Sequence, residues 1–224
     1  MIRLAHPWLS EPIEFRENLS NILVIENTVA YQHFLFSLLR QTDGDKGPFT
    51  LSLDYSPLEF DQHCSVIWDF YHLNTSSRKI NQKLHLMLNS IMHDELVEET
   101  QSIKQEMEAY LNQLVSKSPL PVEYDSEDLE LGLLKTARFN FSLVNERPID
   151  DLIEYLTIYE QLLQNQCVVL IGMDQLFESR ELHYFVQMTQ YRKLNVLRIE
   201  RTIPKTYSET ENIVLFDSDL CEIC

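Results

Sequence analysis

The chain has 224 residues, 44% of them hydrophobic, and a formal net charge of −17 at pH 7. This length and apolar content are enough for one large domain or for a domain with an insertion, and 4 glycines and 8 prolines are too few for a disordered or fibrous protein. The acidic balance argues against a uniformly nucleic-acid-binding surface, so a role with DNA would need a local basic surface and metal ions that offset the acids.

Neither a targeting sequence nor a membrane-spanning segment is indicated. The amino end lacks the apolar region of a signal peptide, and no apolar run approaches the roughly 20 residues of a spanning helix. We therefore expect a soluble cytoplasmic protein without a membrane partner. Cys64 and Cys167 lie in apolar runs and are expected to be buried thiols, whereas the lone pair Cys221 and Cys224 lacks the partners of a zinc site.

Strands and helices alternate along much of the chain. Strands are expected within residues 2–26, and the apolar run Ile22–Ile25 suits a strand buried on both faces. Asn27 and Thr28 can cap the helix that follows. Further strands are expected at 49–53, 65–70, 167–171, 195–199 and 213–216, and further helices after Pro148 and at 179–191. This order predicts an α/β fold with a mostly parallel sheet.

A long helical stretch interrupts the alternation. Beyond residues 74–77 lie about 40 residues with helical periodicity, which favour two long helices packed on each other or one kinked helix. A short helix at 128–138 and an extended piece at 139–143 are expected next. The chain should therefore form an α/β head domain from residues 1–73 and 141–224, with an α-helical leg domain inserted at 74–140.

The first strand and helix are arranged as in a nucleotide hydrolase, but the phosphate loop is missing. After Ile25 the chain continues Glu26-Asn27-Thr28, with neither the glycines that let backbone N–H groups converge nor the lysine that reaches the outer phosphates. No G-x-S-x-G motif or i, i+4 pair of histidines is present. We therefore expect no nucleotide binding of the phosphate-loop type.

One segment is dense in carboxylates: Glu123, Asp125, Glu127, Asp128 and Glu130. Calcium takes six to eight oxygen ligands in a tolerant geometry, and such a segment could supply them. The alternative is a solvated face, or a helix start whose acids complement the helix dipole. The residues alone favour this alternative and leave calcium open.

Basic residues are few but grouped. The candidates for contacts with DNA phosphates are Arg78, Lys79, Lys135, Arg138, Arg192, Lys193 and Arg198. Each group by itself is more often a solvated face than a binding site.

Several segments together carry a family resemblance. They are Glu11–Glu14, Leu23–Glu26, Glu123–Asp125 with Leu129–Lys135, Tyr155–Tyr159 before Val168–Ile171, and Phe216-Asp217. In order and spacing they resemble the short form of the ring-forming protein of type II-A CRISPR adaptation modules.

This resemblance implies a nucleotide-hydrolase-like head without its phosphate loop and an inserted helical leg. It further implies a non-enzymatic homotetrameric ring whose basic hole threads double-stranded DNA by its ends, with calcium (Ca2+) holding the acidic regions together. The partners would be the CRISPR adaptation integrase and the effector nuclease during spacer acquisition. Asn140 and the scarcity of lysines depart from the family pattern and suggest a thinner basic surface.

A different class of function stays open from the residues alone. Asp174 follows the expected strand at 168–171, as a metal-holding acid would, and could act with the acids of 123–130 in a metal-dependent nuclease or nucleotide hydrolase. A helical scaffold without DNA affinity is a third reading. We take the DNA-binding ring as the leading prediction.

Overall fold

The computed structural model describes residues 1–127, 129–164, 166–205 and 207–223. The chain divides into two compact units. Met1–Leu73 and Leu143–Cys224 form the first, called the α/β unit below, and Asn74–Ser142 form the second, called the helical unit. Among the described residues, no helix is long and apolar enough to cross a membrane.

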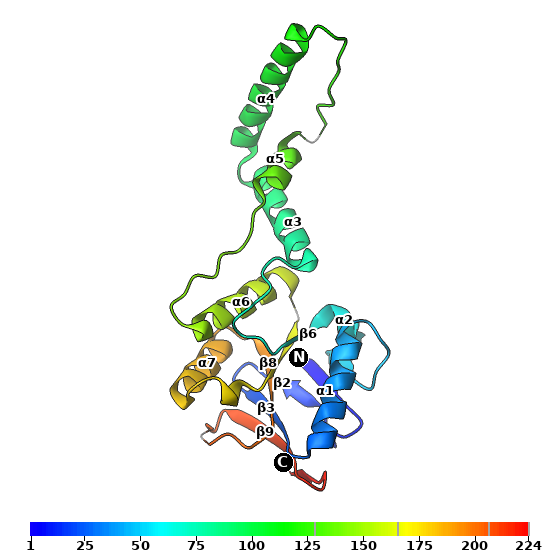
Figure 1. Ribbon diagram of the computed structural model, residues 1–224, viewed down its shortest axis with the longest axis vertical. Coiled ribbons are helices and arrows are strands. Elements are labelled where there is room, and N and C mark those ends of the chain that lie inside the picture. The colour runs from blue at the N-terminus through cyan, green and yellow to red at the C-terminus, as the bar shows by residue number, and fades with distance from the viewer. Residues whose placement is uncertain (128, 165, 206, 224) are drawn as a thin grey trace. The chain divides into compact units, whose positions relative to one another are not determined.

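A six-stranded sheet forms the centre of the α/β unit (Figure 1). Its strands lie in the order β10 (Glu222–Ile223), β9 (Glu211–Phe216), β3 (Ser20–Ile25), β8 (Asn195–Glu200), β7 (Cys167–Ile171) and β6 (Cys64–Ile67). All neighbouring pairs are parallel except β10 with β9. Every residue of β3 is buried, as its apolar run predicts. The prediction of an α/β fold with a mostly parallel sheet is confirmed.

One face of this sheet packs against α1 (Thr28–Thr42) and a second sheet. The second sheet is antiparallel, in the order β2 (Ile13–Phe15), β1 (Ile2–Ala5), β4 (Thr50–Leu53) and β5 (Ser56–Leu58). In β1 the alternate residues Ile2 and Leu4 are buried, because one face of the strand meets the core. The sequence did not predict β5 or the helix α2 (Phe60–His63), which span only 3 and 4 residues.

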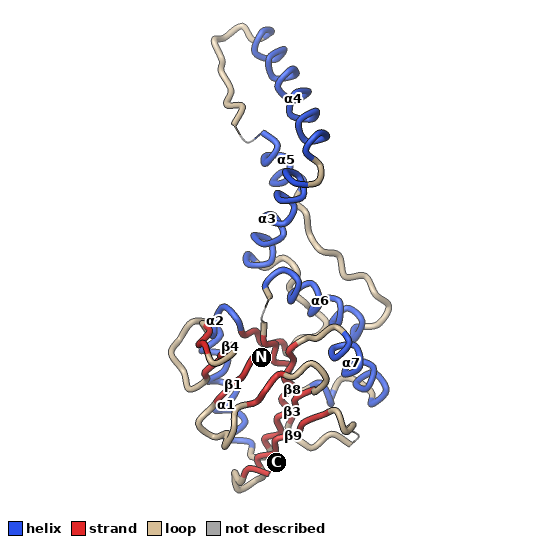
Figure 2. Tube along the Cα trace, turned by 180° about the vertical axis from the view of Figure 1, so that it is seen from behind, coloured by secondary structure: helices blue, strands red, loops and turns tan. Residues whose placement is uncertain are grey.

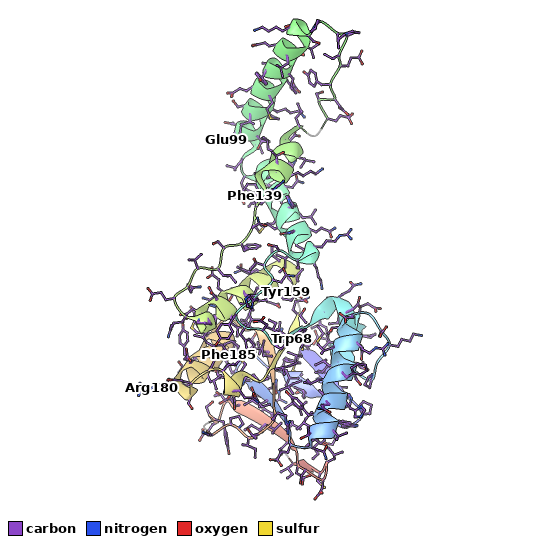
Figure 3. The ribbon with its side chains drawn as sticks, in the orientation of Figure 1. Trp68, Glu99, Phe139, Tyr159, Arg180 and Phe185 are labelled. Carbon is purple, nitrogen blue, oxygen red and sulfur yellow. The ribbon has the colours of Figure 1, made fainter. Side chains whose placement is uncertain are left out.

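The opposite face of the six-stranded sheet is covered by α6 (Pro148–Leu163) and α7 (Ser179–Tyr191), as Figure 2 shows from behind. Pro148 occupies the first turn of α6, as predicted, where its missing N–H costs no hydrogen bond. Phe185 of α7 is fully buried and lies toward the sheet (Figure 3). A short 3-10 helix, η1 (Met173–Gln175), joins β7 to α7.

The connection from β8 to β9 differs from the other crossovers of the parallel sheet. Its described residues between 201 and 210 form neither helix nor strand. Parallel strands are usually joined by a crossover of a dozen or more residues that includes a helix covering the sheet. Beside α7, an irregular segment therefore stands where a covering helix would otherwise lie.

The helical unit contains α3 (Arg78–Asp94), α4 (Val97–Lys117) and α5 (Leu129–Ala137). The chain breaks between α3 and α4 at Glu95 and Leu96, whose N–H groups both donate to the Ile91 carbonyl. In Figures 1 and 2, α4 extends beyond the end of α3 and does not fold back along it. None of the described residues of α4 is buried as a consequence.

The extended piece expected at 139–143 does not pair into a sheet, and these residues form neither helix nor strand. Arg138 has a positive φ of 52°, which ends α5 one residue earlier than predicted. An extended segment becomes a strand only when a neighbouring backbone accepts its hydrogen bonds, and the described residues offer this segment none.

Candidate functional site

The turn between β3 and α1, where a phosphate loop would lie, is occupied by the chain's own side chains. Asn27 caps α1 as predicted, since its Oδ1 accepts hydrogen bonds from the N–H groups of Val29 and Ala30 at 3.1 Å each. Its side-chain amide donates to the Ser218 carbonyl at 2.9 Å. The N–H groups that would bind a phosphate at this helix N-terminus are therefore already satisfied.

Arg201, the residue after β8, lies over the same turn. Its Nη2 donates to Thr28 Oγ1 at 2.8 Å and to the Glu26 carbonyl at 3.5 Å. Its guanidinium carbon lies 5.3 Å from the centre of the Tyr31 ring, within the range of a cation–π contact. No spacing in the sequence signals this arrangement, because Thr28 and Arg201 are 173 residues apart.

Arg198 corrects an expectation, because it was assigned to a DNA-facing surface and is instead 2% exposed. Its Nη2 donates to Asp174 Oδ1 at 2.5 Å and its Nη1 to Glu211 Oε1 at 2.9 Å. Glu200 Oε1 lies 3.9 Å from its Nε. The guanidinium thus faces three carboxylates, and its hydrogen bonds go to two of them and not to a DNA-facing surface.

The same cluster also accounts for Asp174. The sequence suggested that this carboxylate could hold a metal ion, but Arg198 already binds it, and its backbone N–H donates to Glu200 Oε1 at 3.3 Å. Sequence reasoning missed Glu200 and Glu211 as partners. The usable signal was the alternation of β8, which places Arg198 and Glu200 on one face of an otherwise apolar strand.

Burial raises the pKa of Glu200 to about 7, the negative charge of Asp174 adds to the rise, and Arg198 opposes it. One guanidinium cannot fully compensate three carboxylates in a medium of low dielectric constant. Near neutral pH, protonation of Glu200 therefore removes part of the excess negative charge of the cluster.

The remaining basic candidates lie on different parts of the chain. In the helical unit, Arg78 and Lys79 begin α3, Lys135 lies in the last turn of α5, and Arg138 follows that helix. Arg78, Lys135 and Arg138 are exposed, and Lys79 is half-buried. These residues keep the accessibility that a phosphate contact requires.

On the α/β unit, Arg192 and Lys193 are exposed but engaged by their own chain. Arg192 Nη1 donates to Thr157 Oγ1 at 2.6 Å, and Lys193 Nζ pairs with Glu17 at 3.0 Å. Exposed ion pairs contribute about 0–1 kcal/mol, so the pairing of Lys193 does not prevent it from meeting another anion.

The described acids of the segment before α5 are exposed. Glu123, Asp125 and Glu127 all face solvent, and Asp125 Oδ1 accepts the N–H of Glu127 at 2.8 Å. Tyr124 ties the segment to α4, because its hydroxyl donates to Asn112 Oδ1 at 3.0 Å. Asp128 lies outside the described residues.

Glu130 differs from these neighbours, because it is 8% exposed and faces Lys104 of α4, whose Nζ lies 3.3 Å from its Oε2. A hydrogen bond from its own backbone N–H and the Lys104 ammonium lower the pKa of Glu130 against the effect of burial. Among the described residues, no three His, Cys, Asp or Glu side chains converge into a metal-binding group. The described part of one chain thus does not by itself fit a calcium ion, whose ligands number six to eight oxygens.

Comparison with known proteins places the chain in a family. The model of the family described as CRISPR-associated protein (Cas_Csn2) matches residues 41–220. No curated protein matches the chain. The matched segment contains all of the helical unit and most of the α/β unit.

We expect no tight binding of ATP. Asn27 and Arg201 occupy the donors and the space beside the N-terminus of α1, so Mg·ATP has no phosphate cradle there. Isothermal titration calorimetry should show no association with a micromolar dissociation constant, and a colorimetric phosphate assay should show no hydrolysis. A micromolar constant would contradict this interpretation of the turn.

Replacing Glu200 with Gln should change the pH dependence of stability. Because the folded pKa of Glu200 is raised, its carboxyl destabilises the fold progressively as pH rises from the unfolded value of 4.5 to about 7. Gln stays neutral and can still accept the Asp174 N–H. The difference in melting temperature, Glu200→Gln minus wild type, should therefore grow by several degrees between pH 5 and pH 8. This corresponds to a gain of about 1–3 kcal/mol in the unfolding free energy of the variant relative to the wild type.

Comparing the two proteins at each pH removes other titrations, including that of His6, whose pKa burial lowers to about 4. Thermal denaturation followed by circular dichroism provides the measurement. Parallel profiles for the two proteins would show that Glu200 does not titrate in this range.

Proposed function

The chain belongs to the CRISPR-associated Cas_Csn2 family. We propose that it acts in type II-A CRISPR adaptation as a non-catalytic, self-assembling protein that binds double-stranded DNA. In this proposal four copies form a ring around the duplex during spacer acquisition, alongside the adaptation integrase and the effector nuclease. The observation that carries it is the occupied turn between β3 and α1, in a fold that otherwise has the strand–turn–helix order of a nucleotide hydrolase.

The proposal of a non-catalytic role rests on the residues that nucleotide hydrolysis or DNA cleavage would need, because other side chains of the chain already bind them. A nucleotide hydrolase without its phosphate loop cannot cradle a triphosphate, and Asn27 and Arg201 satisfy the groups around that turn. Asp174, the acid expected to hold a metal ion in the alternative nuclease function, is bound by Arg198. These contacts favour binding over catalysis.

The helical unit supports the proposal of self-assembly. Val97, Ile103, Tyr110 and Leu114 of α4 are 42%, 45%, 62% and 49% exposed, and the last three follow one another at helical spacing. A helix of 21 residues gains little stability in water unless an apolar face is covered. A second copy of the chain is the occupant that we propose for this face.

The proposed contacts with DNA lie first on the helical unit. Arg78, Lys135 and Arg138 are exposed, and Lys79 lies beside Arg78. With a net charge of −17, a single chain repels a duplex at long range. A ring places the same few cations around the DNA several times, so their attraction to the phosphates adds up. Arg192 and Lys193 of the α/β unit are secondary candidates, because Thr157 and Glu17 already bind them.

Calcium enters this proposal as a component of the assembly. Glu123, Asp125 and Glu127 are exposed and lack cationic partners among the described residues, so they repel one another or an acidic neighbour when copies meet. A calcium ion bound by these acids, together with oxygens of a second copy, would convert this repulsion into attraction. Glu130 is less suited as a ligand, since Lys104 pairs with it.

Removal of the exposed cations of the helical unit should weaken duplex binding for every sequence alike. The variant Arg78→Ala/Lys135→Ala loses two phosphate contacts per chain, so the slope of log K against log salt should fall by about 0.9 for each contact. A mobility-shift assay with two unrelated duplexes at several salt concentrations provides the measurement. Lys46→Ala, which removes an exposed lysine of the α/β unit, is the control. Equal binding by the variant and the control would mean that residues other than Arg78 and Lys135 contact the DNA phosphates.

Calcium should raise both the mass of the assembly and its melting temperature, because a ligand bound only by the assembled state stabilises that state by mass action. Magnesium should act less well, since it requires a tighter octahedral geometry. Light scattering coupled to gel filtration, in calcium and then in chelator, measures the mass.

The variant Glu123→Gln/Asp125→Asn should lose the response to calcium. Glu99→Gln is the matched control, because Glu99 is exposed on α4 of the same unit (Figure 3). If mass and melting temperature do not respond to calcium in the wild type, the acids form only a solvated face.

A further inference from the structure

The irregular connection between β8 and β9 borders a groove on the α7 side of the sheet. Two adjoining cavities of about 520 and 160 Å³ share Ser179 and Leu182, at the amino-terminal end of α7. Thr202–Lys205 line the larger cavity opposite α7, and Arg198 and Tyr207 line the smaller one. The larger volume lies within the range of ligand-binding pockets, about 300–1,000 Å³.

The acidic side chains of this groove already accept hydrogen bonds or ion pairs from the chain itself. Arg198 binds both Asp174 and Glu211, and Glu211 also accepts the N–H of Ser208 at 2.8 Å. Glu178 caps α7, with its side chain accepting a backbone N–H and its own N–H donating to Glu181. Although acids and bases are mixed here, the carboxylates therefore have little capacity left for a ligand.

Two cations of the groove, in contrast, have no such partners among the described residues. Arg180 extends from α7 (Figure 3) and Lys205 belongs to the facing segment, and both are exposed. Within the described parts of the chain, neither one has a hydrogen bond or an ion pair. In a molecule with a net charge of −17, two uncommitted cations around one cavity mark a position for an anionic group.

An exposed aromatic side chain completes the arrangement. Tyr207 is 61% exposed at the smaller cavity, and Ile203, which is 44% exposed, and Pro204 add apolar surface to the larger one. Cations that bind phosphates, next to an aromatic ring on which a base can stack, are the combination that proteins use for single-stranded nucleic acids. A duplex is too wide and stiff to enter such a cavity, whereas a flexible single strand can follow it.

We propose that the groove between α7 and the connection from β8 to β9 binds a short single-stranded segment of DNA. Arg180 and Lys205 hold its phosphates, and Tyr207 stacks with a base. The inference rests on the proposed DNA-binding function and extends it to a second form of DNA and to the α/β unit. A frayed end, an overhang or a displaced strand of a bound duplex would supply such a segment.

The test measures binding of the full-length protein to fluorescein-labelled oligodeoxythymidylate and, separately, to a blunt duplex by fluorescence anisotropy. The variant Arg180→Ala/Lys205→Ala should bind the oligonucleotide about tenfold less tightly, and its slope of log K against log salt should fall by about 1.4, since each phosphate contact on a single strand contributes about 0.7. Its binding to the duplex should change much less. The variant should fold normally, because both side chains are exposed and neither has a hydrogen bond or ion pair with the described residues.

Substitutions of Tyr207 distinguish the contribution of base stacking to oligonucleotide binding from that of charge. Tyr207→Ala should weaken oligonucleotide binding by about tenfold, and Tyr207→Phe should restore it, because a phenyl ring still stacks. Lys46→Ala, which removes an exposed lysine outside the groove, should bind as the wild type does.

Three results would overturn the inference. The first is that the wild type binds the duplex but not the oligonucleotide, and the second is that the salt slope of the double variant is unchanged. The third is that polyglutamate competes as well as the oligonucleotide, which would mean that the groove recognises charge alone. The first two leave the proposed duplex-binding function intact. Absence of binding to both DNA forms would refute that function as well.

Discussion

The buried guanidinium of Arg198 is the interaction on which the α7 side of the α/β unit depends. It lies in β8, binds Asp174 after β7 and Glu211 in β9, and thereby spans β3, which lies between β8 and β9. Burying a charge costs several kcal/mol, and the cost is offset only when partners are well placed, so loss of any one partner leaves an uncompensated ion. The described residues of the crossover from β8 to β9 form no helix over this sheet face, and the ionic cluster takes over part of the role that apolar packing has elsewhere.

That arrangement has a chemical consequence at the carboxyl ends of the strands. In open parallel sheets this edge is the usual place for a ligand, at a point where the strand order reverses. Here Asp174 is paired with Arg198, Asn27 caps α1, and Arg201 covers the turn between β3 and α1. The edge is thus filled by ion pairs and caps of the chain itself, and the space that stays open lies further along, between α7 and the connection that follows β8.

The helical unit is organised on a different principle. Its longest helix, α4, has no buried residue among those described. Before α5, the exposed carboxylates of Glu123, Asp125 and Glu127 have no cationic partner in the described part of the chain. Apolar side chains in water and uncompensated like charges are both unfavourable in an isolated chain, and both are relieved by contact with other molecules. The α/β unit encloses its largest group of charged side chains, around Arg198, whereas the helical unit exposes both its apolar and its acidic side chains.

The sequence by itself determined the features that local chemistry dictates. The apolar run Ile22–Ile25 specified a buried strand, Asn27 specified a helix cap, Pro148 specified a helix start, and the lack of glycine and lysine after Ile25 excluded a phosphate loop. It also marked a helical stretch that begins near residue 74, and the second compact unit of the structure begins at Asn74. All of these depend on neighbours in the chain, so composition and periodicity are sufficient to read them.

Only the tertiary structure decided which charged groups are available. Arg198 and Arg180 are the same residue type in the same acidic chain, yet one is 2% exposed among carboxylates and the other projects into solvent. The difference arises from contacts with Asp174 and Glu211, and from the helix-free path that brings Lys205 opposite α7. Free energies of charged groups depend on burial and on partners distant in sequence, and neither quantity is encoded in the spacing of residues along the chain.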